Sequence, residues 1–421
     1  MLPMLFTLLL LAGPSQAAEL GPADVPGPGT ASNPPALALQ SDHALIAWKS
    51  PEGLGIAVAK ADGRVLVKTG IRTPVASYPA AAPWRGERDL ATFVLTVPLM
   101  TPEGPRIDVD LVEYSDNVCA VLWTGLSVRG DAAVPVRVDD STFALVYRCE
   151  GKLRVRVFGN VDGVWRWITD EQGQPVELKL SAPGPVERFS VSVAGRPVTT
   201  YLLVAYETPA GTEVVAVNLT DPAHPTIDGA PIPVPGTRPV LLDNVLAYVG
   251  ADGVHAALLV KGTAWKIASD VKVADATDVR PAIVSYGVDR YLIVYGGSEL
   301  RAAEVRIEGT RLGVVREGTL IKEPGYSPTG IGVVRTTERS LEVAGVILAF
   351  YARDGEPTVH VEYSEGLGEL PTQHRRRPVW IVPLLLAASI GAYIGLKLPV
   401  YGQFLWLIIS RARREVPKHD P

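Results

Sequence analysis

Two cysteines, Cys119 and Cys149, are the most reactive side chains in this sequence. Both lie in segments rich in β-branched residues, which is typical of strands. In a protein exported to an oxidising compartment, a pair of cysteines commonly forms a disulfide. We therefore expect a disulfide between Cys119 and Cys149, and the alternative is two buried thiols that pack as small apolar groups.

The six histidines do not form a metal-binding motif, because none of them lies at helical i, i+4 spacing or within an HExxH sequence. The sequence also lacks a GxSxG nucleophile motif and a GxxxxGK[ST] phosphate loop. We predict no metal site, no cofactor and no specific catalytic residue. Enzyme activity stays open, with a protein that is not an enzyme as the preferred interpretation.

Carboxylates occur in close pairs at three places. These pairs are Asp108 with Asp110, Asp139 with Asp140, and Asp275 with Asp278. Hydrolysis of a glycoside needs two carboxyl groups held roughly 5–10 Å apart. The sequence distinguishes none of the three pairs as such a site, so solvated turns and strand faces are the simpler interpretation.

Two tryptophans, Trp165 and Trp167, lie two residues apart on one predicted strand, so their side chains point to the same side. We expect either a contact surface or a platform for a sugar at this place. Packing inside the fold is the alternative.

The N-terminal residues 1–17 resemble a secretory signal peptide. Leu5 to Ala12 is a short apolar run, Pro14 interrupts it, and Ser15 and Ala17 supply the small-x-small pattern of a cleavage site. Because such a run is too short to span a bilayer, we expect cleavage after Ala17 and export of the chain.

A hydrophobic segment near the C-terminus, residues 379–410, predicts one transmembrane helix after a basic linker at 371–378. The RARR cluster at Arg411–Arg414 indicates a cytoplasmic tail at 411–421. Small residues that could let a second helix approach closely are Ala388, Gly391, Ala392 and Gly395. The expected location is a cell membrane crossed once, with the ectodomain in a periplasm or outside the cell, in contact with lipid and with membrane protein partners.

The charge distribution argues against nucleic acid as a partner. The net charge is −5, yet after His374 eight basic residues stand against two acidic ones. The preceding residues therefore hold the acidic excess, and they lack the basic stripe that phosphate binding requires.

The body of the chain, residues 31–370, predicts an all-β fold built from a repeat. A strand of small and β-branched residues ends in a large side chain, and after a turn a second apolar strand follows, as in ALIAW and GIAVAK. The large side chains, which we call the repeat anchors, are Trp48, Leu95, Tyr147, Tyr206, Tyr248, Tyr295 and Tyr351. They recur about every 50 residues, the length of one four-stranded propeller blade.

Seven such units predict a β-propeller with seven four-stranded blades. Residues 18–30 serve either as a linker or as the strand that closes the ring, and 368–372 is the other candidate for closure. The pattern of an aromatic strand end, a second strand and a DG turn (Asp62-Gly63) resembles bacterial extracytoplasmic β-propeller repeat proteins with a C-terminal membrane anchor. Tandem β-sandwich domains are the competing architecture.

Without a catalytic motif, the sequence favours a membrane-anchored binding or scaffold protein, a subunit or accessory of a membrane-envelope complex. The alternative is a membrane-anchored propeller hydrolase or lyase that acts on sugars or lactones at the central funnel. Convergence of several acidic, basic or histidine side chains at one end of the ring axis would distinguish the second hypothesis from the first.

Overall fold

The described residues form strands only, and none of them lies in a helix. The computed structural model describes residues 25–26, 35–40, 42–50, 53–71, 73–87, 90–195, 199–275, 280–296, 299–321, 326–335, 343–351 and 358–364. The chain divides into two units, Met1–Leu370 and Pro371–Pro421. All described residues belong to the first unit.

These strands form seven antiparallel sheets, which we number along the chain. Sheet 1 contains β2 (Ala36–Gln40), β3 (His43–Ser50), β4 (Gly53–Lys60) and β5 (Val65–Ile71). Sheet 2 contains β6 (Ala80–Glu87), β7 (Leu90–Thr101), β8 (Gly104–Ser115) and β9 (Val118–Arg129). Sheet 3 contains β10 (Ala132–Arg137), β11 (Thr142–Cys149), β12 (Lys152–Val161), β13 (Val164–Trp167) and β14 (Glu177–Lys179).

The remaining sheets follow the same order. Sheet 4 contains β15 (Arg188–Ala194), β16 (Tyr201–Thr208), β17 (Gly211–Asn218), β18 (Thr226–Ile227) and β19 (Ile232–Val234). Sheet 5 contains β20 (Thr237–Leu242), β21 (Val245–Val249), β22 (Val254–Lys261) and β23 (Trp265–Ala274). Sheet 6 contains β24 (Ala282–Gly287), β25 (Arg290–Tyr295), β26 (Leu300–Glu308) and β27 (Arg311–Ile321). Sheet 7 contains β28 (Tyr326–Arg335), β29 (Val343–Tyr351), β30 (Thr358–Ser364) and, from the other end of the chain, β1 (Val25–Pro26).

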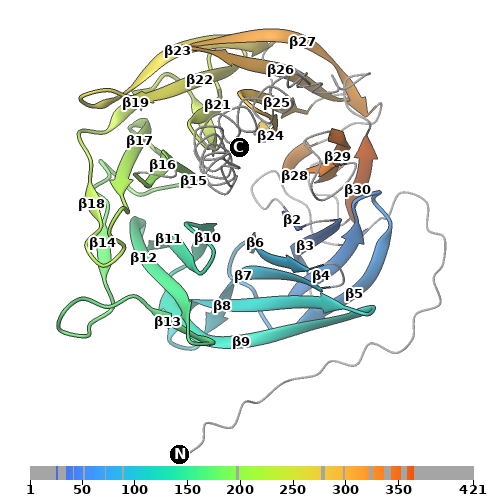
Figure 1. The fold of residues 1–421 in the computed structure, drawn as a ribbon, viewed down its shortest axis with the longest axis vertical. Coiled ribbons are helices and arrows are strands. Elements are labelled where there is room, and N and C mark those ends of the chain that lie inside the picture. Colours follow the sequence, from blue (N-terminus) through green and yellow to red (C-terminus); the bar gives the residue numbers. More distant parts are fainter. Residues whose placement is uncertain are drawn as a thin grey trace, which may run out of the picture. The chain divides into compact units, whose positions relative to one another are not determined.

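The first strands of the seven sheets make a closed ring (Figure 1). Strands β2, β6, β10, β15, β20, β24 and β28 contact one another in this order, and β28 contacts β2. Strand β1 pairs with β30, so that both ends of the unit meet in sheet 7. This arrangement is a β-propeller, as the repeat predicts.

The core consists of separate apolar layers between neighbouring sheets. Seven clusters of buried side chains are present in the described residues, each shared by two adjacent sheets, and one of them joins sheet 7 to sheet 1. A strand in the middle of a sheet therefore faces apolar neighbours on both sides. For this reason β4 is almost wholly buried, whereas the outermost strand β23 alternates between exposed and partly buried residues.

The seven repeat anchors all lie in the second strands of their sheets. Four of the anchors are tyrosines whose hydroxyl groups donate a hydrogen bond to a carboxylate farther out in the same sheet. The pairs are Tyr147 with Glu177, Tyr206 with Glu213, Tyr248 with Asp270, and Tyr295 with Glu317. Trp48 instead covers Gly55 on β4, where an added Cβ would lie 2.1 Å from the indole.

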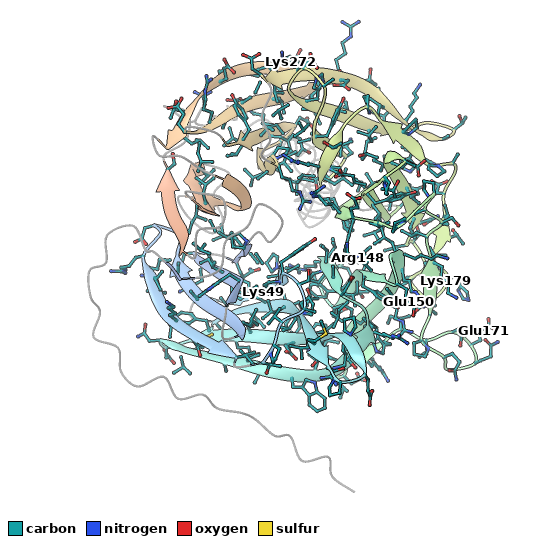
Figure 2. The ribbon with its side chains drawn as sticks, turned by 180° about the vertical axis from the view of Figure 1, so that it is seen from behind. Lys49, Arg148, Glu150, Glu171, Lys179 and Lys272 are labelled. Atoms are coloured by element: carbon teal, nitrogen blue, oxygen red, sulfur yellow. The ribbon has the colours of Figure 1, made fainter. Side chains whose placement is uncertain are left out.

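In sheets 1 to 4, the residue after the anchor, which we call the linking residue, ties its sheet to the next one. Lys49 Nζ donates to Ala76 O at 3.4 Å, Thr96 Oγ1 to Ala133 O at 3.2 Å, and Arg148 Nη1 to Val186 O at 3.0 Å and Glu187 O at 2.8 Å. In sheet 4 the direction reverses, because Glu207 Oε2 accepts a hydrogen bond from Arg238 N at 2.9 Å. Figure 2 shows Lys49 and Arg148 near the centre of the ring, whereas Glu171, Lys179 and Lys272 lie on its outer side.

Several sequence-based predictions fall outside the described residues. They are the signal peptide at 1–17, the basic linker at 371–378, the transmembrane segment at 379–410 with Ala388, Gly391, Ala392 and Gly395, and the tail at 411–421. Within the described ranges, no helix has the length and apolar character that a membrane crossing needs.

Candidate functional site

The central channel is a concave feature of the ring with a volume of about 920 Å³. Its lining comes mainly from the first strands of sheets 1–6, and Leu259, Val260 and Lys261 of β22 add to it. Most of its lining side chains are Ala, Val, Leu, Ile and Pro. Polar groups are few there, so each one that reaches the channel is a candidate for binding or catalysis.

Arg280 is the most unusual of these polar groups. It lies in the channel wall just before β24, and its Nη2 donates to Phe189 O at 3.3 Å and Pro239 O at 3.1 Å. Its Nε is buried and has no hydrogen-bond partner within the described ranges. Burial lowers the pKa of Arg280, and Arg188 adds to this effect, while Tyr78 and Glu207 oppose it.

Glu207 is the carboxylate whose charge affects the pKa of Arg280, and both of its oxygens already accept hydrogen bonds from other groups. Glu207 is 8% exposed, and its Oε1 accepts a hydrogen bond from Arg188 Nη1 at 3.2 Å. Its Oε2 accepts from the backbone N–H of Arg238. Arg188 and Glu207 therefore neutralise each other, and no anion among the described residues pairs with Arg280 at this end of the channel.

At the other end of the channel, the acidic residues have structural roles. Asp243 and Asp289 occupy the turns that join the first and second strands of sheets 5 and 6, with φ angles of 52° and 58°. Asp tolerates this left-handed conformation better than most residues, so turn geometry accounts for both. Asp243 also donates its N–H to Ser192 Oγ at 2.6 Å and accepts from the Tyr291 hydroxyl at 3.2 Å.

Of the three carboxylate pairs considered above, one is buried. Asp108 and Asp110 are 7% and 8% exposed on β8, and Arg106 pairs with Asp108 at 2.8 Å. Burial, together with the negative charge of Asp108, raises the pKa of Asp110 to about 7. The pair belongs to sheet 2 and does not line the channel.

The described members of the other two pairs, Asp139, Asp140 and Asp275, are exposed, as the simpler interpretation predicts. Asp139 accepts hydrogen bonds from the N–H groups of Ser141 and Thr142, which hold its pKa below the ordinary value although partial burial acts the other way. Asp275 is exposed and pairs with Lys272 at 3.2 Å, whereas its partner Asp278 lies outside the described residues.

The predicted disulfide between Cys119 and Cys149 is not formed. Both cysteines are free and buried. Cys119 on β9 packs in the cluster between sheets 1 and 2, and Cys149 on β11 packs in the cluster between sheets 2 and 3. Sheet 2 thus separates the two thiols, and the alternative of two buried apolar groups describes them. Burial raises the pKa of Cys119 to about 11.

Trp165 and Trp167 lie on β13 and are partly buried against the cluster between sheets 2 and 3. The ring of Trp165 meets Trp84 edge-on at 4.7 Å, and the ring of Trp167 meets Phe158 at 5.7 Å. They do share one side of their strand, as predicted. That side packs against the neighbouring sheet, which matches the packing alternative rather than a free platform.

A different tryptophan, Trp123 on β9, is 71% exposed. Its cross-strand partner is Asp110 of the buried pair. No sequence motif marks Trp123, but a tryptophan in the fourth strand of a unit, where charged and polar residues are expected, is itself a signal.

Within the described ranges, no group of three or more His, Cys, Asp or Glu side chains is placed to bind a metal ion. His255 lies between Asp270, at 2.9 Å from Nδ1, and Asp252, at 2.8 Å from Nε2. Although burial opposes it, these two hydrogen bonds raise the pKa of His255. His255 also stacks on Tyr248, so it supports a repeat anchor.

No protein-family model matches the chain, and no curated protein matches it in sequence. Among solved structures, Sqt1 of Saccharomyces cerevisiae is 8% identical with a TM-score of 0.48, over 82% of this chain and 98% of that one. The lectin of Aleuria aurantia, solved with alpha-methyl-L-fucoside, is 11% identical with a TM-score of 0.44, over 70% and 97%. Sqt1 of Chaetomium thermophilum is 11% identical with a TM-score of 0.43, over 77% and 82%. At such low identities, the similarity indicates nothing about the ligand or the activity of this chain.

Proposed function

We propose that this chain is a membrane-anchored extracytoplasmic binding or scaffold protein, a seven-bladed propeller that contacts a membrane protein through the rim of sheet 2. The observation that carries the proposal is Trp123, whose side chain is 71% exposed on the regular strand β9. A rigid, exposed tryptophan offers a large apolar area at a low entropic cost, and tryptophan is enriched among residues that dominate binding energy at interfaces.

The sheet to which Trp123 belongs supports this assignment. Eight large hydrophobic side chains are exposed among the described residues, and three of them, Met100, Val118 and Trp123, belong to sheet 2. Strands β7, β8 and β9 each have 12 residues, whereas β3 and β4 of sheet 1 have 8. Sheet 2 therefore offers a longer and more apolar surface than its neighbour, as the long strands β8 and β9 in Figure 1 illustrate.

The membrane part of the proposal rests on the sequence. Residues 1–17 direct export, 371–378 form a basic linker, 379–410 cross the membrane once, and 411–421 remain in the cytoplasm. In this arrangement the propeller faces a periplasm or the cell exterior, as in the bacterial extracytoplasmic proteins that the repeat resembles. A partner helix packs against the small residues of the span.

The alternative of a hydrolase or lyase at the channel receives less support. A general acid or base must be free to exchange a proton with a substrate. The buried carboxylate near Arg280, Glu207, is held by Arg188 and by the backbone N–H of Arg238. Its oxygens are therefore engaged in holding sheets 4 and 5 together.

Affinity purification tests the proposal. The full chain with a tag after Pro421 is extracted in mild detergent, and proteins that co-purify are identified by mass spectrometry. We expect a stoichiometric membrane protein that is lost with Trp123→Ala and retained with Val315→Ala, a change at another exposed rim residue. A chain that purifies alone, or equal recovery with both variants, contradicts partner binding through sheet 2.

A further inference from the structure

The channel wall contains a cation for which the described part of the chain supplies no anion. Arg280 makes no ion pair there, because Glu207 is engaged by Arg188 and by the Arg238 N–H. A guanidinium that is removed from water without a counter-charge is unfavourable, and burial accordingly lowers the pKa of Arg280. An anionic ligand that enters the channel relieves this imbalance.

Donor groups remain available at the same place. The hydrogen bonds of Arg280 within the described ranges come from Nη2 alone, which leaves Nη1 without an acceptor. The hydroxyl group of Tyr78, which also lines the channel, makes no hydrogen bond to described residues. Arg280 and Tyr78 thus each present an unused donor group in the lining of the channel.

Most of the remaining wall is apolar. It includes Ala36 and Leu37 of β2, Val191 of β15, and Ala282 and Ile283 of β24. The other charged lining residues are engaged: Arg137 pairs with Asp140, Lys261 pairs with Asp228, and Asp243 accepts a hydrogen bond from the Tyr291 hydroxyl. A cavity of about 920 Å³ is at the upper end of the range that encloses small organic ligands. A ligand that fits this wall has an apolar body and a single charged end.

We propose that the central channel binds an amphipathic monocarboxylate, with its carboxylate on Arg280 and its apolar body along the first strands of the sheets. This site is separate from the partner surface on sheet 2 and goes beyond the proposed function. A carboxylate fits better than a phosphate monoester, because one uncompensated positive charge balances a single negative charge. Guanidinium groups bind carboxylates by strong, charge-assisted hydrogen bonds.

Isothermal titration calorimetry of the purified full chain in a maltoside detergent tests this site. The probes are 4-phenylbutyrate, its neutral analogue 4-phenyl-1-butanol, and 3-phenylpropylphosphonate. We expect 4-phenylbutyrate to bind at least about tenfold more tightly than either analogue. Arg280→Gln weakens its binding by at least about tenfold. Arg280→Lys keeps the charge but not the planar guanidinium, so it weakens binding less than Arg280→Gln. Arg306→Gln, at an exposed arginine of the same sheet, leaves binding unchanged.

Several results would overturn the proposal. They are no binding of 4-phenylbutyrate to the natural chain at millimolar concentration, equal binding of the alcohol, tighter binding of the phosphonate, or equal loss in Arg280→Gln and Arg306→Gln. Arg280 also links sheets 4, 5 and 6 through its hydrogen bonds. If Arg280→Gln does not fold for this reason, the three probes are compared on the natural chain and on the Arg280→Lys variant, and that comparison decides the question. Failure of partner binding at Trp123 does not affect these titrations.

Discussion

Trp123 and Asp110 face each other across strands β9 and β8, yet one is 71% exposed and the other is 8% exposed. The carboxyl of Asp110 is buried beside Asp108, and its Oδ1 has no hydrogen-bond partner within the described ranges. The exposed tryptophan thus stands on a strand pair that also contains a carboxyl group sensitive to pH. The two residues lead to separate predictions.

The stability of the ring depends on pH through Asp110. Its pKa is about 7 in the folded chain against an ordinary value of 3.8, so ionisation favours the unfolded chain. The contribution of Asp110 to the free energy of unfolding is therefore highest below about pH 4, falls as the pH rises, and levels off above about pH 7. At 1.36 kcal/mol per pKa unit, this fall amounts to about 4 kcal/mol.

Urea unfolding at pH 5 and pH 8, for the natural chain and for Asp110→Asn, measures this effect. The amide cannot ionise, so the variant loses most of the difference between the two pH values. Glu103→Gln, at the exposed turn between β7 and β8 of the same sheet, serves as the control and should retain the natural pH dependence. Identical pH dependence in Asp110→Asn and the natural chain would show that Asp110 does not titrate in this range.

Replacing Glu304 destabilises sheet 6 strongly. Glu304 is 0% exposed on β26, and its two oxygens accept hydrogen bonds from Arg290 Nε at 2.8 Å and Arg316 Nε at 2.7 Å. Removing one member of a buried ion group leaves the others uncompensated, at a cost of about 3–5 kcal/mol. We expect Glu304→Gln to lower the free energy of unfolding by this amount.

The matched control is Glu308→Gln on the same strand. Glu308 is exposed and lies 3.8 Å from Arg306, and exposed pairs of this kind contribute about 0–1 kcal/mol. Chemical denaturation of both variants compares the two positions. A loss below about 1 kcal/mol in Glu304→Gln would contradict the buried triad.

Arg148 holds sheet 3 to sheet 4 through the backbone oxygens of Val186 and Glu187. Hydrogen bonds to charged groups contribute about 1.5–3 kcal/mol. We expect Arg148→Met to lower stability by this order and to speed amide hydrogen exchange in 182–190, while Arg129→Met, at an exposed side chain, changes neither. Unchanged exchange in that segment would exclude the linking role of Arg148.

The two cysteines should behave as thiols. Cys119 and Cys149 lie on opposite sides of sheet 2, so alkylation of the chain unfolded without reductant should modify both of them. In the folded chain the reaction should be slow, because both are buried and the thiolate of Cys119 is disfavoured by its raised pKa. If mass spectrometry finds both cysteines unmodified and joined to each other, the disulfide forms after all.

The repeat could be predicted from the sequence because its cause is local. A second strand that is buried on both faces needs small and β-branched residues, and its end needs a large anchor such as Tyr206 or Tyr248 to fill the space between sheets. These requirements recur in each sheet, so they leave a periodic pattern. The location of all seven anchors in second strands follows from this periodicity.

The polar contacts between sheets could not be predicted in this way. The linking residues Lys49, Thr96, Arg148 and Glu207 share a position but not a residue type, because each meets a backbone group that is set by its own connection. The exposure of individual side chains could not be predicted from the sequence either. Trp165 packs against Trp84 of the preceding sheet, whereas Trp123 is exposed. Which of the two tryptophans is buried depends on how neighbouring sheets pack in the closed ring.

Site-specific photo-crosslinking in cells tests the central claim most directly. A photoreactive phenylalanine analogue replaces Trp123 in one variant and Val315 in another, both at exposed rim positions of the ring. The account predicts a crosslink from position 123 to one membrane protein and none from position 315. Crosslinks that are absent from both positions, or the same from both, would contradict a partner surface on sheet 2.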